Sequence, residues 1–524
     1  RCCIERIWDN KIELRLNYQQ RNPIVFPEKS LYALEHDHMD ASTNSIYRGL
    51  YQFLKAPQDR KDLILCQREP RFDYTKKLQG KYTNEVINRI VLQAKRALDY
   101  FLLVGPPGTG KTSVALKSIV QEFYGDSSCN ILLMSYTNRA VDEICEMLES
   151  IQPKPSYLRI GKELSCEPRF RSHLLKNQTE ELKNREQIRS LFQQNRIIVG
   201  TVSSLGGQLH TLFKLKHFNV AIIDEASQIL EPQLLGILSA VDVQGNCAIE
   251  KFIMVGDHKQ LPAVVVQRPE QSQVTNELLL NIGLKDKRNS LFERLYTWQL
   301  ENQITGSVST LLRQGRMHPE VADFANKHFY HCELLPVPVP HQQESLEFSK
   351  HGTDFQEYVA TTRFGFLHCD YPKIEENNKS NIGEAKIVAA IVGNIYELCK
   401  LNKLEFEPAK RIGIIVPFRG QIAMIKKELA KLPIPNTEEI VIDTVERFQG
   451  SQRDIMIFSA TISQKYQLNI ISAPVEIEGQ QVDRKLNVAL TRAKKQMFII
   501  GNEHLLKLDP LYRDLIKRGS TSDC

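Results

Sequence analysis

The stretch FLLVGPPGTGKTS, residues 101–113, constrains the fold of this 524-residue chain more than any other. It opens with apolar residues typical of a buried strand, and it leads into SVALKSIVQEF, which has the spacing of a helix. Between them, residues 105–112 match GxxxxGK[ST], a loop whose backbone amides turn toward phosphate oxygens. A strand, a phosphate loop and a helix in this order predict an α/β domain with a parallel sheet.

Short apolar segments alternate with helical patterns along most of the chain, which predicts repeated βαβ units. The first series of expected strands covers residues 101–104, 131–135, 197–200, 220–224 and 252–256. The second series covers residues 364–368, 412–416, 441–444, 455–459 and 497–500. A chain of this length exceeds what one hydrophobic core normally supports, so we expect two tandem α/β domains joined near residues 300–310.

The segments around these domains have patterns of their own. Residues 1–20 alternate in polarity across a turn near Asp9 and Asn10, which predicts a hairpin from a small β-barrel. A charged, polar helical run over residues 162–194 predicts a surface insertion. The expected organisation is 1–30 for the end of the barrel, 31–98 for a helical stalk and linker, 99–302 for the first α/β domain with an insertion at 155–195, and 303–524 for the second.

The composition limits the class of protein but does not identify a binding partner. The net charge of +6 is compatible with a polyanionic partner but does not argue for one. No apolar run approaches the ~20 residues of a membrane span, and the eleven cysteines are scattered as free thiols would be in a reducing compartment. We therefore expect a soluble intracellular protein, cytoplasmic or nuclear (nucleoid), with no membrane partner. Because the chain begins at Arg1, we expect it to be part of a longer polypeptide.

A pair of acids supplies the carboxylates that a phosphate loop requires. In NVAIIDEAS, Asp224 and Glu225 follow an apolar strand. We expect Asp224 and the hydroxyl of Thr112 to hold Mg²⁺, and Glu225 to orient and deprotonate the attacking water. No NKxD guanine signature is present, so adenine is the expected base.

Five blocks occur one after another between residues 224 and 495: DEAS, GDHKQLPA, QGRMHP, TVERFQG and LNVALTRAKK. With them the chain resembles the superfamily 1B helicases of nonsense-mediated decay and the Dna-two-like replication and repair enzymes. The resemblance implies two RecA-like domains with ATP in the cleft between them, and a partial barrel that clamps a nucleic-acid strand. It also implies that a nuclease or another domain lies upstream in the longer protein.

The resemblance assigns residues to nucleotide chemistry. Gln260 would sense the γ-phosphate, Asp257 would brace the Gln260 loop, and Arg316 and Arg492 would reach the γ-phosphate from the second domain. The expected catalytic residues are Lys111, Asp224, Glu225, Gln260, Arg316 and Arg492. The expected nucleotide-binding residues are Gly105, Pro106, Pro107, Gly108, Thr109, Gly110, Lys111, Thr112, Ser113, Asn88 and Gly450.

Asn88 departs from the family pattern, since it stands where the family carries a glutamine that reads adenine. Gln93 is the other candidate for contacting the base. Which of the two residues does so stays open, and with it the base preference. In RQGRMHP, Gly315 replaces the usual tyrosine.

The resemblance also implies a path for a single strand. The expected nucleic-acid-binding residues are Thr137, Asn138, Ser203, Ser204, Thr444, Arg447 and Gln449. Most have short polar side chains at strand ends, which suits contacts to phosphates and not to base edges. Asn138 has a second interpretation as the N-cap of a helix whose core face is Val141, Ile144, Met147 and Leu148. Whether the strand is DNA or RNA stays open.

The leading hypothesis is therefore an ATP-dependent helicase that translocates 5′ to 3′ on single-stranded nucleic acid, with the polarity implied by the resemblance. The alternative is an ATP-gated clamp or remodelling ATPase that unwinds little. A third hypothesis is an ATPase that acts on partner proteins, which predicts no salt-dependent binding to single strands.

Overall fold

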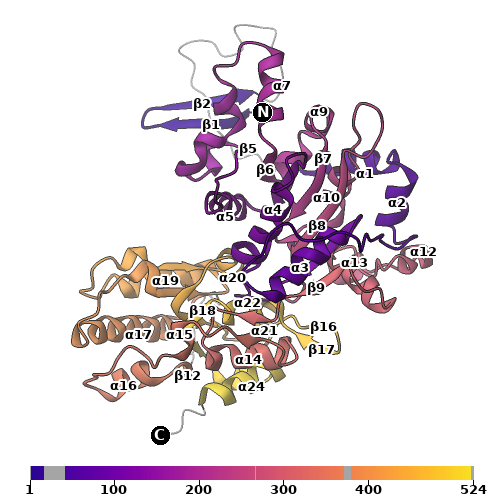
Figure 1. The fold of residues 1–524 in the computed structure, drawn as a ribbon. Helices are drawn as coiled ribbons and strands as arrows, with labels where there is room; N and C mark the ends of the chain where they lie inside the picture. The colour runs from indigo at the N-terminus through magenta and orange to yellow at the C-terminus, as the bar shows by residue number, and fades with distance from the viewer. Residues whose placement is uncertain (1, 17–41, 266, 371–378, 521–524) are drawn as a thin grey trace. The chain divides into compact units, whose positions relative to one another are not determined.

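The computed structural model describes residues 2–16, 42–265, 267–370 and 379–520. These residues separate into two compact units (Figure 1). The first contains residues up to 104, 111–256 and 262–310, and the second contains 105–110, 257–261 and everything from 311. Two short segments that follow strands of the first unit, 105–110 and 257–261, thus group with the second.

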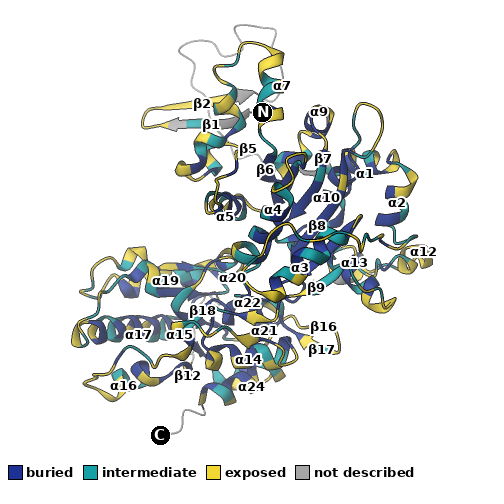
Figure 2. Ribbon diagram, in the orientation of Figure 1, coloured by how far each residue is buried: buried dark blue, intermediate teal, exposed yellow. Residues whose placement is uncertain are grey.

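A parallel sheet of seven strands forms the centre of the first unit's described part, in the order β5-β6-β4-β7-β8-β3-β9. Its strands are β3 (Tyr100–Val104), β4 (Ile131–Ser135), β5 (Tyr157–Ile160), β6 (Ile197–Thr201), β7 (Phe218–Ile223), β8 (Ile249–Gly256) and β9 (Val308–Thr310). Every residue of β3, β4, β5 and β6 is buried. Figure 2 colours the described residues by burial, with buried ones in dark blue. Parallel strands are covered on both faces, which explains why they are continuous apolar runs in the sequence.

Helices connect and cover these strands. They are α1 (Ser42–Leu54), α2 (Gln58–Ile64), α3 (Glu85–Arg96), α4 (Lys117–Tyr124), α5 (Asn138–Glu149), α6 (Leu175–Thr179), α7 (Arg185–Gln194), α8 (Val202–Gly206), α9 (Leu209–Leu215), α10 (Glu231–Leu238), α11 (Pro269–Ser272), α12 (Glu277–Asn281) and α13 (Leu291–Glu301). A π-helical turn, Lys111–Leu116, precedes α4. Segments of 3-10 helix occupy Glu163–Ser165, Pro168–His173 and Ala226–Gln228.

A parallel sheet of five strands forms the centre of the second unit's described part, in the order β12-β18-β15-β13-β14. Its strands are β12 (Phe364–His368), β13 (Ile412–Ile415), β14 (Val441–Asp443), β15 (Arg453–Ser459) and β18 (Ala493–Gly501). Alternate residues along a strand enter two different cores, since Ile414 packs on one face of the sheet and Ile415 on the other. Both faces of this sheet are therefore covered.

The second unit carries two small strand pairs besides its main sheet. They are β10 (Arg313–Gln314) with β11 (Leu335–Pro336), and the hairpin of β16 (Val475–Ile477) with β17 (Gln480–Val482). The helices are α14 (Pro319–Phe329), α15 (Pro340–Gln343), α16 (Asp354–Thr361), α17 (Ile382–Leu401), α18 (Pro408–Arg411), α19 (Arg419–Leu429), α20 (Val445–Phe448), α21 (Leu468–Ile471), α22 (Arg484–Leu490), α23 (Glu503–Leu506) and α24 (Pro510–Ser520), with 3-10 turns at Thr437–Glu439 and Lys465–Gln467.

The expected N-terminal hairpin is present. Strands β1 (Cys2–Trp8) and β2 (Lys11–Leu16) pair antiparallel, with Trp8 opposite Lys11 across the predicted turn. Arg6 on β1 donates to Glu163 at 3.2 Å and to Glu180 at 3.1 Å, which ties the hairpin to the segment after β5. The rest of the expected barrel segment, from residue 17, lies outside the described residues.

The segment 155–195 differs from the expected insertion at its start. Residues 157–160 form β5, a buried edge strand of the main sheet, and are not part of a surface excursion. Arg159 on this strand is 1% exposed and forms an ion pair with Asp142 of α5. The charged arginine interrupts the apolar pattern of the short run YLRI, so the sequence does not indicate a buried strand there. In the fold, the carboxylate of Asp142 pairs with the buried arginine.

Candidate active site and nucleic-acid interface

The phosphate loop leaves β3 at Val104 and enters a helical turn at Lys111. Gly108 and Gly110 both have φ of 75°, a conformation that glycine adopts without steric cost. A Cβ on Gly108 would lie 2.5 Å from Cβ of Arg316, and the Gly108 carbonyl accepts a hydrogen bond from the amide of Gly315 at 2.9 Å. Glycine at 108 thus allows the backbones of the phosphate loop and of the arginine loop to approach closely.

The two acids lie at the carboxyl end of β7, beside the first helical turn after the phosphate loop. The Thr112 hydroxyl donates to Oδ2 of Asp224 at 2.7 Å, and Nζ of Lys111 lies 3.8 Å from Oε1 of Glu225. Glu225 has a positive φ of 53°, and its side chain accepts a hydrogen bond from Gln228 at 2.9 Å. A hydroxyl, an ammonium and two carboxylates therefore meet at one edge of the first unit's sheet.

Asp224 is the most buried of these groups, at 3% exposed. Burial, together with the neighbouring Glu225, raises the pKa of Asp224 to about 6, although Thr112 and Lys111 act in the opposite direction. The oxygens of Thr112 and Asp224 are hard ligands of the kind that Mg²⁺ prefers. The donor set thus fits a magnesium ion held by one hydroxyl and one carboxylate.

The loop that follows β8 is held by Asp257, which is 1% exposed. Its carboxylate accepts hydrogen bonds from the amide of Lys259 at 3.0 Å, from Nε2 of Gln260 at 2.7 Å and from the hydroxyl of Tyr330 at 2.8 Å. Oε1 of Gln260 in turn accepts from Nη2 of Arg492 at 3.1 Å. Within the second unit, Asp257 and Arg492 together fix both ends of the Gln260 amide.

Arg316 and Arg492 come together at Thr491. Nη1 of Arg316 donates to the Thr491 carbonyl at 3.2 Å, and Nη2 of Arg492 donates to the Thr491 hydroxyl at 3.2 Å. Arg492 is 2% exposed, and its Nε donates to the carbonyl of Val488 at 3.0 Å. The second unit thus holds two guanidinium groups at Thr491, and that of Arg492 also contacts Gln260.

The two candidate base-reading residues both make local contacts in the first unit. Oδ1 of Asn88 accepts from the amide of Tyr82 at 2.8 Å. Oε1 of Gln93 accepts from the hydroxyl of Ser309, on β9, at 2.5 Å. Gly450, the remaining candidate for nucleotide contact, has φ of 81° after α20.

Candidate nucleic-acid contacts of the first unit lie beyond two paired strands. Ser135 of β4 is opposite Thr201 of β6, so Thr137 and Ser203 each follow a strand by two residues at the same edge. Ser203 is exposed, whereas the hydroxyl of Ser204 donates to the carbonyl of Ile160 at 3.2 Å. Ser203 is therefore more accessible to a ligand than Ser204.

The N-cap of α5 is Thr137, not Asn138 as one interpretation of the sequence had it. The hydroxyl of Thr137 accepts from the amide of Ala140 at 3.1 Å, and Asn138 is the first helical residue. Threonine and asparagine are both favoured N-cap residues and stand next to each other here, so sequence alone could not place the boundary. The expected core face of this helix is confirmed, because Val141, Ile144, Met147 and Leu148 are all buried.

The second unit's candidate contacts surround the short helix α20. The Thr444 amide donates to Oδ1 of Asp443 at 2.8 Å, and Arg447, 69% exposed at its side chain, lies 3.6 Å from the same carboxylate. Gln449 follows the helix, and its Nε2 is buried with no hydrogen-bond partner among the described residues. Thr444 and Arg447 are thus joined through Asp443.

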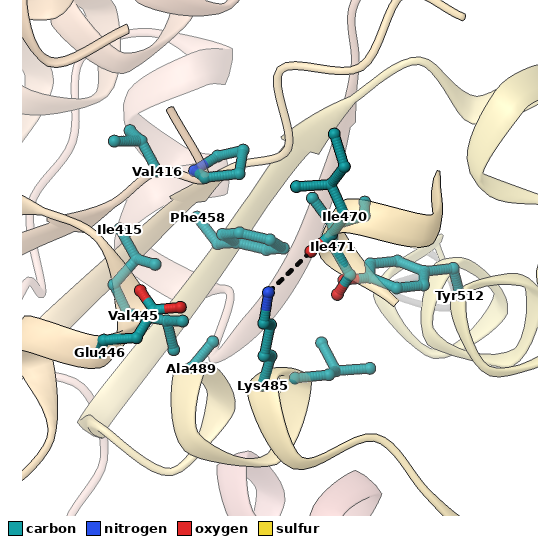
Figure 3. A pocket seen from close by; sticks show the side chains of 12 residues that line it. Ile415, Val416, Val445, Glu446, Phe458, Ile470, Ile471, Lys485, Ala489 and Tyr512 are labelled. Atoms are coloured by element: carbon teal, nitrogen blue, oxygen red, sulfur yellow. Dashed lines mark hydrogen bonds between the residues drawn. The ribbon is translucent and has the colours of Figure 1, made fainter. Parts of the chain in front are cut away.

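A small, mainly apolar pocket of about 40 Å³ is lined in part by α20 (Figure 3). Val445 and Glu446 form one wall, and Nζ of Lys485 donates across the opening to the carbonyl of Ile470 at 2.9 Å. The pocket is enclosed by β13, β15, α21, α22 and α24. Helix α20 therefore borders an incompletely filled space through Val445 and Glu446.

Two residues that matter to this geometry were missed from the sequence. Tyr330 reaches Asp257 from a position 73 residues away, and no local pattern marks it. Asn487 donates to the carbonyl of Lys259 at 2.7 Å, and its place within LNVALTRA was the one available signal.

This fold and this constellation define a phosphate-loop nucleotide-binding protein of the α/β class. Two family models, both described as AAA domain, match residues 82–187 with 173–268 and residues 287–504. In the described part of the chain, no helix is both long enough and apolar enough to cross a membrane.

Curated relatives match across most of the chain. It is 27% identical over 521 residues to the DNA replication ATP-dependent helicase/nuclease DNA2 of Bos taurus, covering 95% of this chain and 46% of the relative. The Xenopus laevis protein of the same name is 29% identical, with 95% and 46% covered. The regulator of nonsense transcripts 1 homolog of Neurospora crassa is 28% identical, with 81% and 37% covered.

The chain belongs to the superfamily 1B helicases, a family of ATP-dependent enzymes. It spans less than half the length of these relatives. The membership expected from the motifs is confirmed, and so is the α/β fold with parallel sheets.

Proposed function

We propose that this chain is the motor of an ATP-dependent helicase that translocates along single-stranded nucleic acid, in the 5′ to 3′ direction. The observation that carries the proposal is the meeting of Lys111, Thr112, Asp224 and Glu225 at one sheet edge, with Thr112 2.7 Å from Asp224. A separate base beside the metal-binding carboxylate suits an enzyme that hydrolyses its nucleotide repeatedly.

Each residue has a distinct part in the proposed reaction. The amides of residues 105–110 and the ammonium of Lys111 bind the phosphates of ATP, and Glu225 orients the water that attacks the γ-phosphate. Thr112 and Asp224 hold Mg²⁺, which neutralises phosphate charge when it is bound with the nucleotide. Arg316 and Arg492 supply the positive charge that phosphoryl transfer needs.

The single strand is proposed to bind through its backbone. Thr137 and Ser203 of the first unit and Thr444 and Arg447 of the second present hydroxyls and one cation at strand ends, which suits phosphate contacts without base selection. The strand is DNA or RNA. A nuclease or another domain elsewhere in a longer protein belongs to this proposal, because relatives carry the name helicase/nuclease. An intracellular location is also part of this proposal.

The decisive measurement is ATP hydrolysis with and without matched DNA and RNA homopolymers. We expect stimulation by at least one of them, and Lys111→Ala should lower the rate by about 10²–10³-fold because a charge that stabilises the transition state is lost. Lys117→Ala, six residues further along, is the matched control and should retain activity. A wild-type rate that is the same with and without oligonucleotide would exclude the proposal.

One variant distinguishes the motor proposal from the alternative of an ATP-gated clamp. Glu225→Gln should stop both hydrolysis and unwinding of a tailed duplex if the motor proposal is right, whereas a clamp would keep its function. Duplexes with a 5′ or a 3′ tail then test the direction. An ATPase that serves partner proteins would show no salt-dependent binding to single strands.

A further inference from the structure

The hairpin β16–β17 turns through Glu478 and Gly479. Ile477 pairs with Gln480, so Glu478 and Gly479 make the whole turn. The φ angles of Glu478 and Gly479 are 51° and 77°. Positive φ at both positions is the pattern of a type I′ turn, which favours Asn-Gly or Asp-Gly. Glutamate is disfavoured in this conformation, so backbone preference does not explain its presence at 478.

The side chain of Glu478 instead contacts three basic residues. Its Oε2 lies 2.5 Å from Nζ of Lys259 and 3.8 Å from Nε2 of His331, and its Oε1 lies 3.3 Å from Nε2 of His258. His258 and Lys259 are 4% and 5% exposed. Burial by itself would raise the pKa of Glu478, but its contacts with His258 and Lys259 hold that pKa well below its ordinary value.

These contacts fall on the loop that carries Gln260. Asp257, Lys259 and Gln260 are each held from other parts of the second unit, by Tyr330, Asn487 and Arg492 respectively. Glu478, at the tip of the β16–β17 hairpin, adds an ionic contact to those made by Tyr330, Asn487 and Arg492. A buried lysine needs a negative partner, because an unpaired charge in a poorly solvated place is strongly unfavourable.

We propose that Glu478 is a positioning residue, which holds the His258–Lys259 segment in place so that Gln260 stays aligned with Arg492. The expected effect of Glu478 on ATP hydrolysis rests on the proposed function. Its expected effect on the position of residues 257–261 rests on the contacts alone. Glu478 extends the machinery to a hairpin that no sequence motif marked.

The turn itself provides a clean set of variants. Asp and Asn both suit a type I′ turn better than Glu, and they differ from each other only in charge. Glu478→Asn removes the charge while relieving the turn, and Glu478→Asp keeps the charge on a side chain shorter by one carbon. Glu476→Gln, an exposed acid on the same hairpin, is the matched control.

The first readout is steady-state ATP hydrolysis with a saturating single-stranded oligonucleotide. We expect Glu478→Asn to lower kcat about tenfold, with KM for ATP and the Kd for the oligonucleotide within about twofold of wild type, since His258, Lys259 and His331, which Glu478 contacts, are not among the residues proposed to bind either ligand. Glu478→Asp should recover part of kcat, and Glu476→Gln should match wild type. A residue that served only the turn would predict the reverse order, with Glu478→Asn at or above wild type.

The second readout does not depend on activity. Amide hydrogen exchange over residues 257–261 should be about tenfold faster in Glu478→Asn than in wild type, with Glu478→Asp in between, because the ion pair to the loop is lost. If the wild type shows no stimulated ATP hydrolysis, the proposed function fails while exchange still decides the role of Glu478. Wild-type exchange and wild-type kcat in Glu478→Asn would overturn the inference.

Discussion

Glu384 is a fully buried carboxyl group near the start of α17. It accepts hydrogen bonds from the hydroxyl of Ser459 at 2.6 Å, from the amide of Thr461 at 2.9 Å and from Nδ2 of Asn381 at 3.3 Å. Burial raises the pKa of Glu384 to about 7, even though these hydrogen bonds act to lower it. Glu384 is therefore disfavoured in its charged form.

This residue should make the stability of the second unit depend on pH. A raised pKa means that the folded state binds more protons than the unfolded state between about pH 4.5 and 7, so the free energy of unfolding falls as pH rises through that window. Glu384→Gln resembles the neutral form and should lose this dependence. We expect its stability relative to wild type to increase by roughly 2 kcal/mol from pH 5 to pH 8.

Urea unfolding at the two pH values measures this difference. Glu397→Gln, an exposed acid on the same helix, is the control and should show no such trend. An equal effect of Glu384→Gln at pH 5 and pH 8 would contradict the argument from burial.

At the scale of elements, helices α1 and α10 of the first unit meet at a pair of glycines. A Cβ on Gly236 would lie 2.4 Å from the Cα of Gly49, a backbone atom that no side-chain rotation can move away. The close approach of the two helices thus depends on the absence of a side chain at 236.

Gly236→Ala should lower the stability of the first unit by about 1–3 kcal/mol, because overpacking outweighs the gain in helix propensity of about 1 kcal/mol. Thermal unfolding measures the effect. Gly206→Ala, whose Cβ would meet no atom within 4 Å, is the control and should change stability little. An unchanged melting temperature for Gly236→Ala would show that the helices separate without penalty.

At the scale of the whole molecule, each unit has hydrophobic cores of its own. The described core of the first unit includes Leu102, Leu132 and Phe252, and those of the second lie on the two faces of its five-stranded sheet. Units with separate cores are expected to unfold as separate cooperative blocks.

Differential scanning calorimetry should therefore resolve more than one transition. Gly236→Ala is expected to lower the transition of the first unit alone, by about 2–4 °C for each kcal/mol lost. Glu384→Gln should change the other transition alone, and that transition should rise relative to wild type between pH 5 and pH 8. Equal shifts of one common transition in both variants would show that the units unfold together.

Much of the fold could be predicted from local pattern. Residues 131–135 and 364–368 are strands at the predicted positions, because a parallel strand buried on both faces is a continuous apolar run. β5 was missed because Arg159 interrupts its apolar pattern, and β9 because three partly exposed residues carry too little signal.

The amino-acid sequence by itself determined the phosphate loop, the acid pair at 224 and 225 and the α/β class, since each depends on neighbouring residues and on the period of apolar positions. Only the tertiary structure decided which side chains hold the Gln260 loop. Tyr330, Glu478 and Asn487 come to it from 73, 220 and 228 residues away in contacts with Asp257, His258 and Lys259. Contacts over such separations are set by how strands and helices pack together, and no local spacing encodes them.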